Sequence, residues 1–334
     1  MSAAATPAGR ATSGPTTAFG RWLRDSAWTI SLVGFLALAL MFTRLIQPTY
    51  GVSGIQGLAI SVLPLALAAV AQAIVVISGG IDLSIGAMMA LTSVVAASQM
   101  KGQSEEVAAV VVVAVLLLGL LLGAVNGGLV VITRVPDIVV TLAMSFVWAG
   151  CALLVLRVPG GAAAVWLKDL AKGWVGIEWI PKPALVLFVI VALIWIPVHR
   201  SRLGLSLYAV GSNQLAAFRS GVNVGRTKVA GYMLTGLFSA FGGLALVASS
   251  GSATPLVGGY TLMSVAAIVL GGVSLAGGRG GVVGPIIAVM ILALMQTIMT
   301  FLGINPNLAT IMQGAVLIGV VMFGSVMQMR RRRA

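Results

Sequence analysis

The chain has 334 residues, of which 59% are hydrophobic and only 8% are charged, and its mean hydropathy is +1.10. Soluble domains carry about 25% charged residues, so this composition excludes a soluble globular protein. Apolar runs of about 17 to 25 residues recur along the chain, the length with which helices cross a ~30 Å hydrocarbon core. The sequence therefore predicts an all-α polytopic membrane protein with about ten transmembrane helices.

The net charge of +13 comes from 20 Lys and Arg residues against 7 Asp and Glu residues. When the spans are followed in order, most of these cations fall in connections on one side. Excess Lys and Arg mark cytoplasmic connections, so we expect both termini in the cytoplasm and no nucleic-acid partner. The basic cytoplasmic C-terminus, 329–334, is interpreted as a topology anchor near anionic membrane lipid.

In chain order, a polar segment (1–26) is expected to form a flexible cytoplasmic N-terminal tail, and the transmembrane domain is expected to occupy 27–328. A Trp-bearing polar segment (157–182) suits an interfacial position outside, and the basic connection 199–228 is expected inside. The spans are expected at about 28–46, 54–78, 82–100, 107–132, 138–156, 183–198, 229–250, 261–275, 281–302 and 307–327.

Two apolar runs meet at the stretch Ile77–Gly86, where a pair of glycines stands beside a lone carboxylate, Asp82. An isolated charge is costly in hydrocarbon, so we expect either a very short loop at the membrane surface or a functional break within the membrane. We interpret Asp82 as the N-cap of the next span, where it would accept backbone N–H groups. Direct contact with a transported molecule is the alternative.

A similar pattern, Gly271–Gly278, follows another long apolar run and predicts a second interrupted helix. Paired interruptions are where binding or gating elements of transporters tend to lie. The charge distribution places both breaks toward the cytoplasmic side. The residues assigned to the gate and the helix breaks are Ser78, Gly79, Gly80, Asp82, Ser84, Gly271, Gly272 and Ser274.

Glycine is abundant, with 42 residues. Gly119, Gly123 and Gly127 recur at every fourth position of the fourth expected span. Small residues at this spacing let a second helix approach closely in a membrane, so we expect a helix–helix contact along this ridge.

Several kinds of chemistry have no basis in the sequence. The phosphate-binding pattern G-x-x-x-x-G-K-S/T is absent, so the chain cannot bind ATP through such a loop. Cys151 and His199 are the only residues of their types, which excludes an intrachain disulfide and effectively excludes a His/Cys metal site. We expect no catalytic residue, no metal and no cofactor bound by this chain.

The connection 199–228 contains the pattern of a short surface helix at about 212–221. Asn213 is a good N-cap, and Gly221 is a suitable C-terminal stop. Such a helix would present Leu215, Phe218 and Arg219 to the cytoplasm or to a partner. Without other information, it could equally be an ordinary loop helix.

Four stretches, occurring in one order along most of the chain, together resemble the membrane permease of ribose-type ABC importers, in the branched-chain amino acid/ribose permease superfamily. They are Gly79–Gly86, Val135-Pro136 leading into Ile138–Leu142, Gly211–Gly221 and Val269–Gly280. The chain departs from the family pattern at Asp137, where an apolar or small residue is more usual, and at Gln214-Leu215, where acidic residues are common.

The resemblance implies a roughly ten-helix subunit that works as a homo- or heterodimer in the bacterial cytoplasmic membrane. It implies a cytoplasmic ABC ATPase that binds ATP and Mg, and a periplasmic or lipid-anchored sugar-binding protein. It also implies that the short helix couples the permease to the ATPase through Asn213, Gln214, Leu215, Ala216, Phe218, Arg219 and Gly221.

The expected function is import of a monosaccharide or related small polyol by alternating access. A branched-chain amino acid-type ABC permease and a secondary transporter remain as alternatives. Neutral polar side chains in apolar spans are candidates for the transport pathway, although interhelical hydrogen bonds, worth about 0.6 kcal/mol each, would also explain them. These candidates are Gln72, Asn126, Thr141, Ser145, Gln296 and Gln313.

Overall fold

The computed structural model describes residues 18–305 and, beyond them, residues 307, 308, 311, 312, 314, 315, 318, 319 and 322. Most of the expected tenth span, Gln313 and the segment 329–334 lie outside these residues. The helices that the structure describes are α1 (Ala18–Ile46), α2 (Val52–Ile77), α3 (Ile85–Met100), α4 (Glu105–Thr133), α5 (Asp137–Val155), α6 (Val165–Ala171), α7 (Lys182–Arg200), α8 (Arg202–Ser212), α9 (Gln214–Arg219), α10 (Val224–Ser250), α11 (Tyr260–Leu270) and α12 (Val283–Phe301).

The nine expected spans that fall within the described residues are all helical. Seven of these helices are long and apolar enough to cross a membrane, and α3 and α11 are shorter apolar helices. Their bounds differ from expectation at two places that matter for the site: α3 begins at Ile85 rather than near 82, and α11 ends at Leu270 rather than near 275. Helix α1 begins at Ala18, within the segment that was expected to be a tail.

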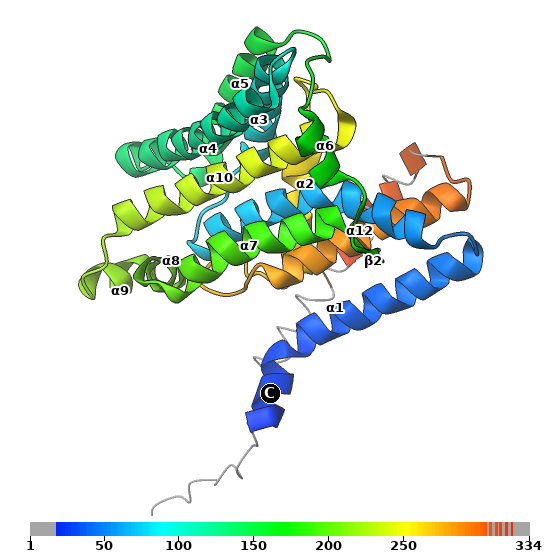
Figure 1. The fold of residues 1–334 in the computed structure, drawn as a ribbon. Helices are drawn as coiled ribbons and strands as arrows, with labels where there is room; N and C mark the ends of the chain where they lie inside the picture. The colour runs from blue at the N-terminus through cyan, green and yellow to red at the C-terminus, as the bar shows by residue number, and fades with distance from the viewer. Residues whose placement is uncertain are drawn as a thin grey trace, which may run out of the picture.

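Helix α2 forms the centre of the bundle. All its residues from Val62 to Ile77 are buried, as expected of a helix that is hydrophobic on every face. Helix α10 lies between α4 and α2 and also packs on α3, while α12 and α11 cover other faces of α2 (Figure 1). Helix α1 packs along α12 at the edge of the bundle.

Local sequence signals explain where α4 begins and ends. The hydroxyl of Ser104 faces the amide of Val107 at the start, and Glu105 and Glu106 lie in the first turn, where carboxylates favour the helix dipole. The helix ends at Thr133, and the C-cap residue Arg134 adopts a left-handed conformation with φ 57°. Pro136 follows two residues later and fixes the direction in which α5 begins.

The glycine ridge predicted on α4 is confirmed as a contact with α10. A Cβ added to Gly119 would lie 2.6 Å from the carbonyl oxygen of Gly236, and one added to Gly127 would lie 2.9 Å from the Cα of Val229. Between them, a Cβ on Gly123 would overlap the carbonyl oxygen of Tyr232. The backbones of the two helices are therefore in direct contact, which only glycine permits at these positions.

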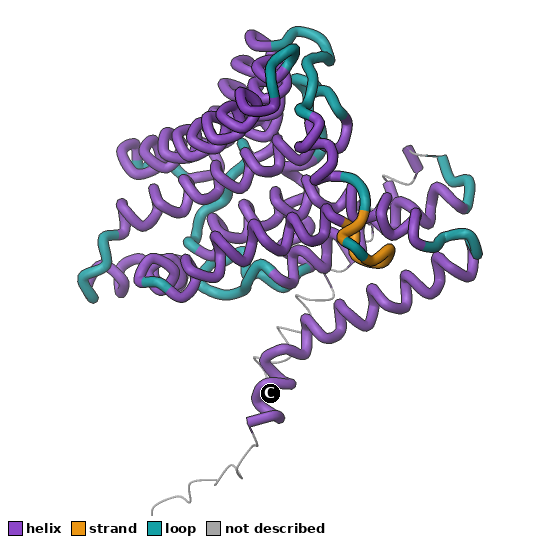
Figure 2. The backbone as a smooth tube through the Cα atoms, viewed as in Figure 1, coloured by secondary structure: helices purple, strands orange, loops and turns teal. Residues whose placement is uncertain are grey.

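The polar segment 157–182, for which no helix or strand was predicted, contains α6 and a small antiparallel hairpin. Strands β1 (Trp174–Val175) and β2 (Ile177–Pro181) pair so that Trp174 faces Pro181. Figure 2 shows this hairpin at the end of the bundle opposite α9. We call the two ends of the molecule the hairpin end and the α9 end.

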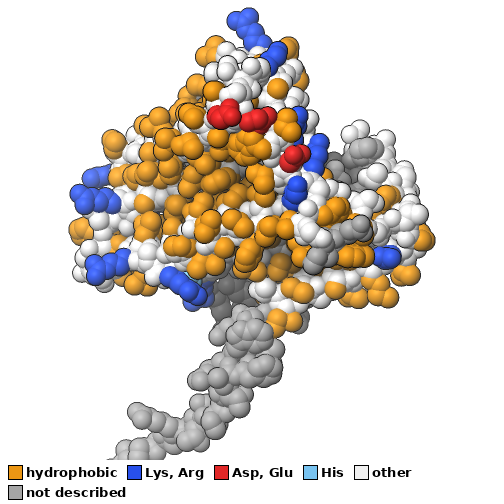
Figure 3. Space-filling model, in the orientation of Figure 1, with side chains coloured by type: hydrophobic (Ala, Val, Ile, Leu, Met, Phe, Trp, Pro, Cys, Tyr) orange, Lys and Arg blue, Asp and Glu red, His pale blue; other side chains and the backbone are white. Residues whose placement is uncertain are grey.

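Charge and hydrophobicity are separated on the surface in agreement with a membrane protein. Figure 3 shows a broad hydrophobic flank, with Lys and Arg side chains but no acidic ones at the α9 end, whereas Lys, Arg, Asp and Glu side chains lie together on the opposite side. The α9 end is the one that the positive-inside bias assigns to the cytoplasm. Its orientation in a membrane stays a prediction.

The α4–α10 contact can be tested with two alanine substitutions on the same helix. Gly123→Ala is expected to lower the free energy of unfolding by about 1–3 kcal/mol, because the new methyl group displaces the α10 backbone. Gly128→Ala is the matched control, since a Cβ there meets no atom within 4 Å, and it is expected to be neutral or slightly stabilising. Thermal unfolding of the purified protein in detergent measures both. Equal effects of the two substitutions would contradict the close contact.

Candidate functional site

The predicted break after α2 is present in the structure. Helix α2 ends at Ile77, and Gly79 turns the chain with φ 83°. The amide of Gly79 donates to the Val76 carbonyl and the amide of Gly80 donates to the Val75 carbonyl, which is the Schellman arrangement that closes a helix at a left-handed glycine. Residues 79–84 then cross to the start of α3 outside any helix.

Asp82 is fully buried inside this break. Its Oδ1 accepts hydrogen bonds from the amide of Ser84 at 2.7 Å and from the hydroxyl of Ser84 at 2.6 Å. The N-cap position of α3 is Ser84 rather than Asp82, because the bond from Asp82 to the Ser84 amide forms a turn before the helix begins. Asp82 therefore lies two residues before the N-cap, Ser84, and it stabilises the turn within the break instead of capping α3.

The hydrogen bonds continue from this turn into two neighbouring helices. The side-chain amide of Asn126 on α4 donates to the Ser84 hydroxyl at 2.7 Å, and its oxygen accepts from the indole of Trp148 on α5 at 3.1 Å. Asn126 thus connects the break to both helices. The other carboxylate oxygen of Asp82 has no hydrogen-bond partner among the described residues.

Side chains of α5 and α10 hold the opposite side of the break. The hydroxyl of Thr141 accepts a hydrogen bond from the amide of Leu83 at 3.0 Å and lies 3.2 Å from the carbonyl of Ile81. Next to it, the hydroxyl of Tyr232 donates to the carboxylate of Asp137 at 3.1 Å. Asp137 also forms an ion pair with Lys228 at 3.3 Å.

This ion pair was not anticipated from the sequence. Asp137 and Lys228 are 91 positions apart, and no periodic pattern relates them. The sequence marked Asp137 only as a departure from the family pattern, a charged residue directly after Pro136 where an apolar or small residue is more usual.

The second predicted break, after α11, has the same backbone geometry. The amide of Gly272 donates to the Val269 carbonyl, and the amide of Val273 donates to the Ile268 carbonyl. Gly272, with φ 81°, therefore corresponds to Gly79, one position away from the sequence match of Gly271 with Gly79. Helices α9 and α12 end with the same motif at Gly221 and Gly303, so this geometry alone does not establish an internal repeat.

The two breaks meet each other beside α8. The amide of Gly278 donates to the carbonyl of Ile77 at 3.0 Å. A Cβ on Gly79 would lie 3.3 Å from the Cα of Gly211 in α8, and one on Gly277 would lie 2.9 Å from the Cα of Gly79. Three backbone segments from distant parts of the chain are thus in contact without intervening side chains. We call Gly79, Gly211, Gly277 and Gly278 the glycine junction.

The short helix predicted at 212–221 is present as α9 and follows α8 after one residue. The side chain of Asn213 caps it by accepting from the amide of Ala216 at 2.9 Å, and Gly221 leaves it with φ 86°. Leu215 and Phe218 are exposed to 58% and 67%, respectively. Its geometry is as expected, whereas its coupling role stays a prediction. The preceding helix, α8, was not foreseen as a separate element.

The remaining pathway candidates lie in different surroundings. Gln72 is fully buried in α2, and neither atom of its amide has a partner among the described residues. The hydroxyl of Ser145 donates to the Leu142 carbonyl in its own helix at 2.6 Å. Gln296 is exposed on α12, and Gln313 lies outside the described residues. Of the six candidates, the structure joins only Asn126 and Thr141 to the break.

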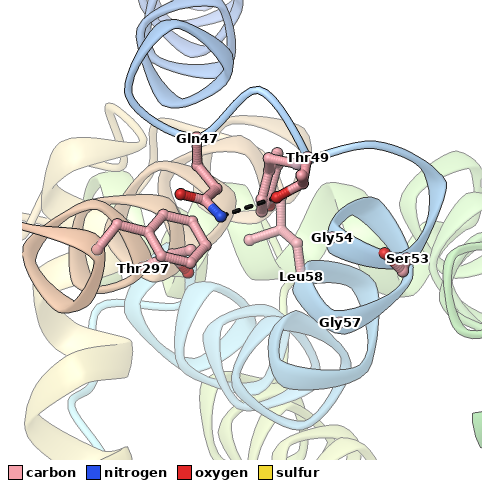
Figure 4. A pocket seen from close by; sticks show the side chains of 9 residues that line it. Gln47, Thr49, Ser53, Gly54, Gly57, Leu58 and Thr297 are labelled. Atoms are coloured by element: carbon pink, nitrogen blue, oxygen red, sulfur yellow. Dashed lines mark hydrogen bonds between the residues drawn. The ribbon is translucent and has the colours of Figure 1, made fainter.

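A pocket of about 360 Å³ lies at the hairpin end, between the α1–α2 connection and α12 (Figure 4). The side-chain amide of Gln47 donates to the hydroxyl of Thr49 across its mouth at 2.8 Å. None of the predicted site residues lines this pocket, so it is separate from the break. Within the described residues there is also no cluster of three or more His, Cys, Asp and Glu side chains that could hold a metal ion.

Comparison with known proteins identifies relatives over nearly the whole chain. The sequence model of the family described as branched-chain amino acid transport system / permease component matches residues 54–321. The ribose import permease protein RbsC of Escherichia coli is 33% identical, covering 92% of this chain and 97% of the relative. The autoinducer 2 import system permease protein LsrD of Shigella flexneri is 29% identical, covering 90% of this chain and 92% of the relative. No solved structure matches the chain.

Two substitutions separate the charge of Asp82 from its hydrogen bonds. Asp82→Asn keeps an oxygen to accept from Ser84 and removes a buried charge, so we expect stability equal to or above that of the unmodified protein. Asp82→Ala loses both bonds and is expected to lower the free energy of unfolding by about 1–3 kcal/mol. Unfolding in detergent gives both values. Loss of stability in both variants to the same extent would show that the charge itself is required.

Proposed function

Because the chain belongs to the family of branched-chain amino acid transport system permease components, we propose that it is the membrane-spanning permease subunit of an ATP-driven importer for a monosaccharide or a related small polyol. The protein is a multi-pass protein of the bacterial cytoplasmic membrane. The names of its relatives support the substrate class, since ribose and autoinducer 2 are the molecules that these name. The family description keeps a branched-chain amino acid as the second candidate.

ATP hydrolysis is assigned to a separate subunit. The full sequence has no phosphate-binding loop of the G-x-x-x-x-G-K-S/T type, so a cytoplasmic ABC ATPase with bound ATP and Mg would supply the energy. A second permease chain, identical or related, and a periplasmic or lipid-anchored sugar-binding protein complete the proposed assembly. The chain itself performs no covalent chemistry in this proposal.

Helix α9 is the observation that carries the proposed mechanism. It is exposed at the end of the bundle where positive charge gathers (Figure 3), and its apolar residues Leu215 and Phe218 face away from the subunit. Exposed aromatic residues in such a position suit docking into a groove of a partner. A single residue, Asn213, separates α8 from α9 and caps both helices. A displacement of α9 would therefore be transmitted directly to α8.

The glycine junction would convert that displacement into movement of the gate. Gly211 on α8 lies against the carbonyl of Ile77 and the amide of Gly278, one from each helix break. A shift of α8 therefore acts on both breaks at once. Alternating access requires such a concerted change, and the energy for it comes from differential binding of the ATPase in its two states.

Gln72 is proposed as a pathway residue because its buried amide has no hydrogen-bond partner among the described residues. Leaving a buried amide without partners costs about 1–3 kcal/mol for each unsatisfied group, and Gln72 lies in the stretch Val62–Ile77 of α2, in which every residue is buried. A neutral polyol passing along α2 would supply the missing hydrogen bonds for a short time. A weak, uncharged contact of this kind suits a passage that must release its cargo.

The coupling role of α9 predicts a specific loss of the ATPase. Phe218→Asp is expected to abolish co-purification of the ATPase and ATP-dependent uptake while the permease remains folded in the membrane, because the charge replaces an exposed apolar contact. Val158→Asp is the matched control, since Val158 is also 67% exposed but follows α5 at the other end of the bundle. Retention of the ATPase by the Phe218 variant would remove α9 from the interface.

The pathway role of Gln72 predicts opposite effects on stability and transport. Gln72→Met replaces an unsatisfied amide by an apolar side chain of similar size, so we expect equal or greater thermal stability. Uptake of labelled sugar into proteoliposomes is expected to fall about tenfold or more, which corresponds to the loss of roughly 1.4 kcal/mol in the transport barrier. Unchanged uptake would mean that the amide has no contact with the cargo.

A further inference from the structure

The ion pair between Asp137 and Lys228 lies directly on the helix break that follows α2. Asp137 is the first residue of α5, and Lys228 is the fifth residue of α10. Their side chains are 16% and 13% exposed, and the Lys228 amine lies 3.3 Å from both carboxylate oxygens. It is the only salt bridge among the residues that the structure describes.

The carboxylate of Asp137 fills the space that a side chain at Gly80 would occupy. A Cβ added to Gly80 would lie 2.5 Å from an oxygen of Asp137 and 3.0 Å from the hydroxyl of Tyr232. The ion pair therefore presses on the backbone of the break without an intervening side chain. Any movement of Gly80 changes the surroundings of the carboxylate, and any loss of the carboxylate leaves Gly80 without its neighbour.

Hydroxyl groups that reach the break are also in contact with Asp137, Tyr232 with its carboxylate and Thr141 with its backbone carbonyl. The hydroxyl of Tyr232 has one proton and two acceptors in reach, Asp137 at 3.1 Å and the carbonyl of Ile81 at 3.4 Å. The hydroxyl of Thr141 lies near three carbonyls, those of Asp137 at 2.9 Å, Ile81 at 3.2 Å and Ile138 at 3.4 Å. The Ile81 carbonyl is thus farther from both hydroxyls than the Asp137 oxygen that each of them reaches. The position of Asp137 determines how firmly the break is held.

Opposite charges in a partly buried site attract each other more strongly than at the surface. Removal of one partner leaves the charge of the other partly buried and unpaired, which is unfavourable. Asp137 lies in the first turn of α5, where the helix dipole also favours a carboxylate. Lys228 has no such support near the beginning of α10. The pair therefore links two helices across the break, with Asp137 bound from several directions.

Resting on the proposed transport function, we propose that Asp137, Lys228 and Tyr232 are positioning residues of the gate, which hold the α2–α3 break against α5 and α10 until α9 is displaced. The ion pair keeps the break in the conformation seen here when no cargo is delivered. Weakening it lets the break move without cargo, so ATP is hydrolysed without transport. The pair thus sets the coupling between hydrolysis and import.

The test uses the complete complex of permease, ATPase and sugar-binding protein in proteoliposomes. Hydrolysis without sugar and binding protein, hydrolysis with both, and sugar uptake are measured together with the amount of assembled complex. Lys228→Met, which keeps the side-chain length and removes the charge, is expected to raise basal hydrolysis about three- to tenfold and to lower the sugar imported per ATP. Tyr232→Phe is expected to change both quantities in the same direction but less.

Two variants serve as controls for charge and for fold. Lys228→Arg keeps the cation and is expected to retain coupling. Arg226→Gln removes a cation two residues away that has no carboxylate partner among the described residues, and it is also expected to retain coupling. The double variant Asp137→Asn with Lys228→Met is expected to resemble the more affected single variant. The effects of substitutions at two residues that act as a pair do not add.

Normal assembly with unchanged basal hydrolysis and unchanged sugar per ATP in Lys228→Met would overturn the proposal. If Lys228→Met fails to assemble, Tyr232→Phe becomes the test variant, because it removes only a hydroxyl group. Unchanged basal hydrolysis and unchanged sugar per ATP in Tyr232→Phe would also overturn the proposal. Absence of ATP-dependent uptake by the unmodified complex would instead contradict the proposed function. The two failures are therefore distinguishable.

Discussion

Backbone groups that leave a helix inside a membrane protein cannot turn to water, so other parts of the protein must bind them. The break after α2 shows how this constraint organises the structure. The carbonyl of Ile77 is bound by the amide of Gly278, and the amide of Leu83 is bound by the hydroxyl of Thr141. The segments that supply these partners, the loop after α11 and helix α5, are thereby held against the break.

Two groups of side chains share this task on opposite sides of the break. Asp82, Ser84 and Asn126 form one continuous series of hydrogen bonds that is buried and ends at Trp148. On the other side, Tyr232 and the carboxylate of Asp137 are arranged around an ion pair that remains partly exposed. The second group contains hydroxyls, those of Tyr232 and Thr141, that each reach more than one acceptor. The break is thus held toward α3 and α4 by a buried series of bonds, and toward α5 and α10 by hydroxyls with more than one acceptor in reach.

Much of this architecture could be predicted from the sequence, because hydrophobic length, glycine pairs and capping residues act locally. The first nine spans, the break at Gly79, the contact ridge at Gly123 and the capped helix after Asn213 all follow from such local signals. The ion pair and the junction partner Gly211 could not be found in this way, since each depends on segments far apart in the chain. Polar residues such as Asn126 and Thr141 were recognised as exceptional, but only the fold shows which backbone groups they bind.

The glycine junction has a consequence for how such a protein can diversify. Its contacts are made by main-chain atoms, which are the same in every residue, so they carry no chemical preference of their own. Changes in the exposed residues of α9 can therefore alter the choice of partner without altering the connection to the breaks. In the proposed mechanism, the connection between α9 and the two breaks is thus independent of the side chains that select the partner.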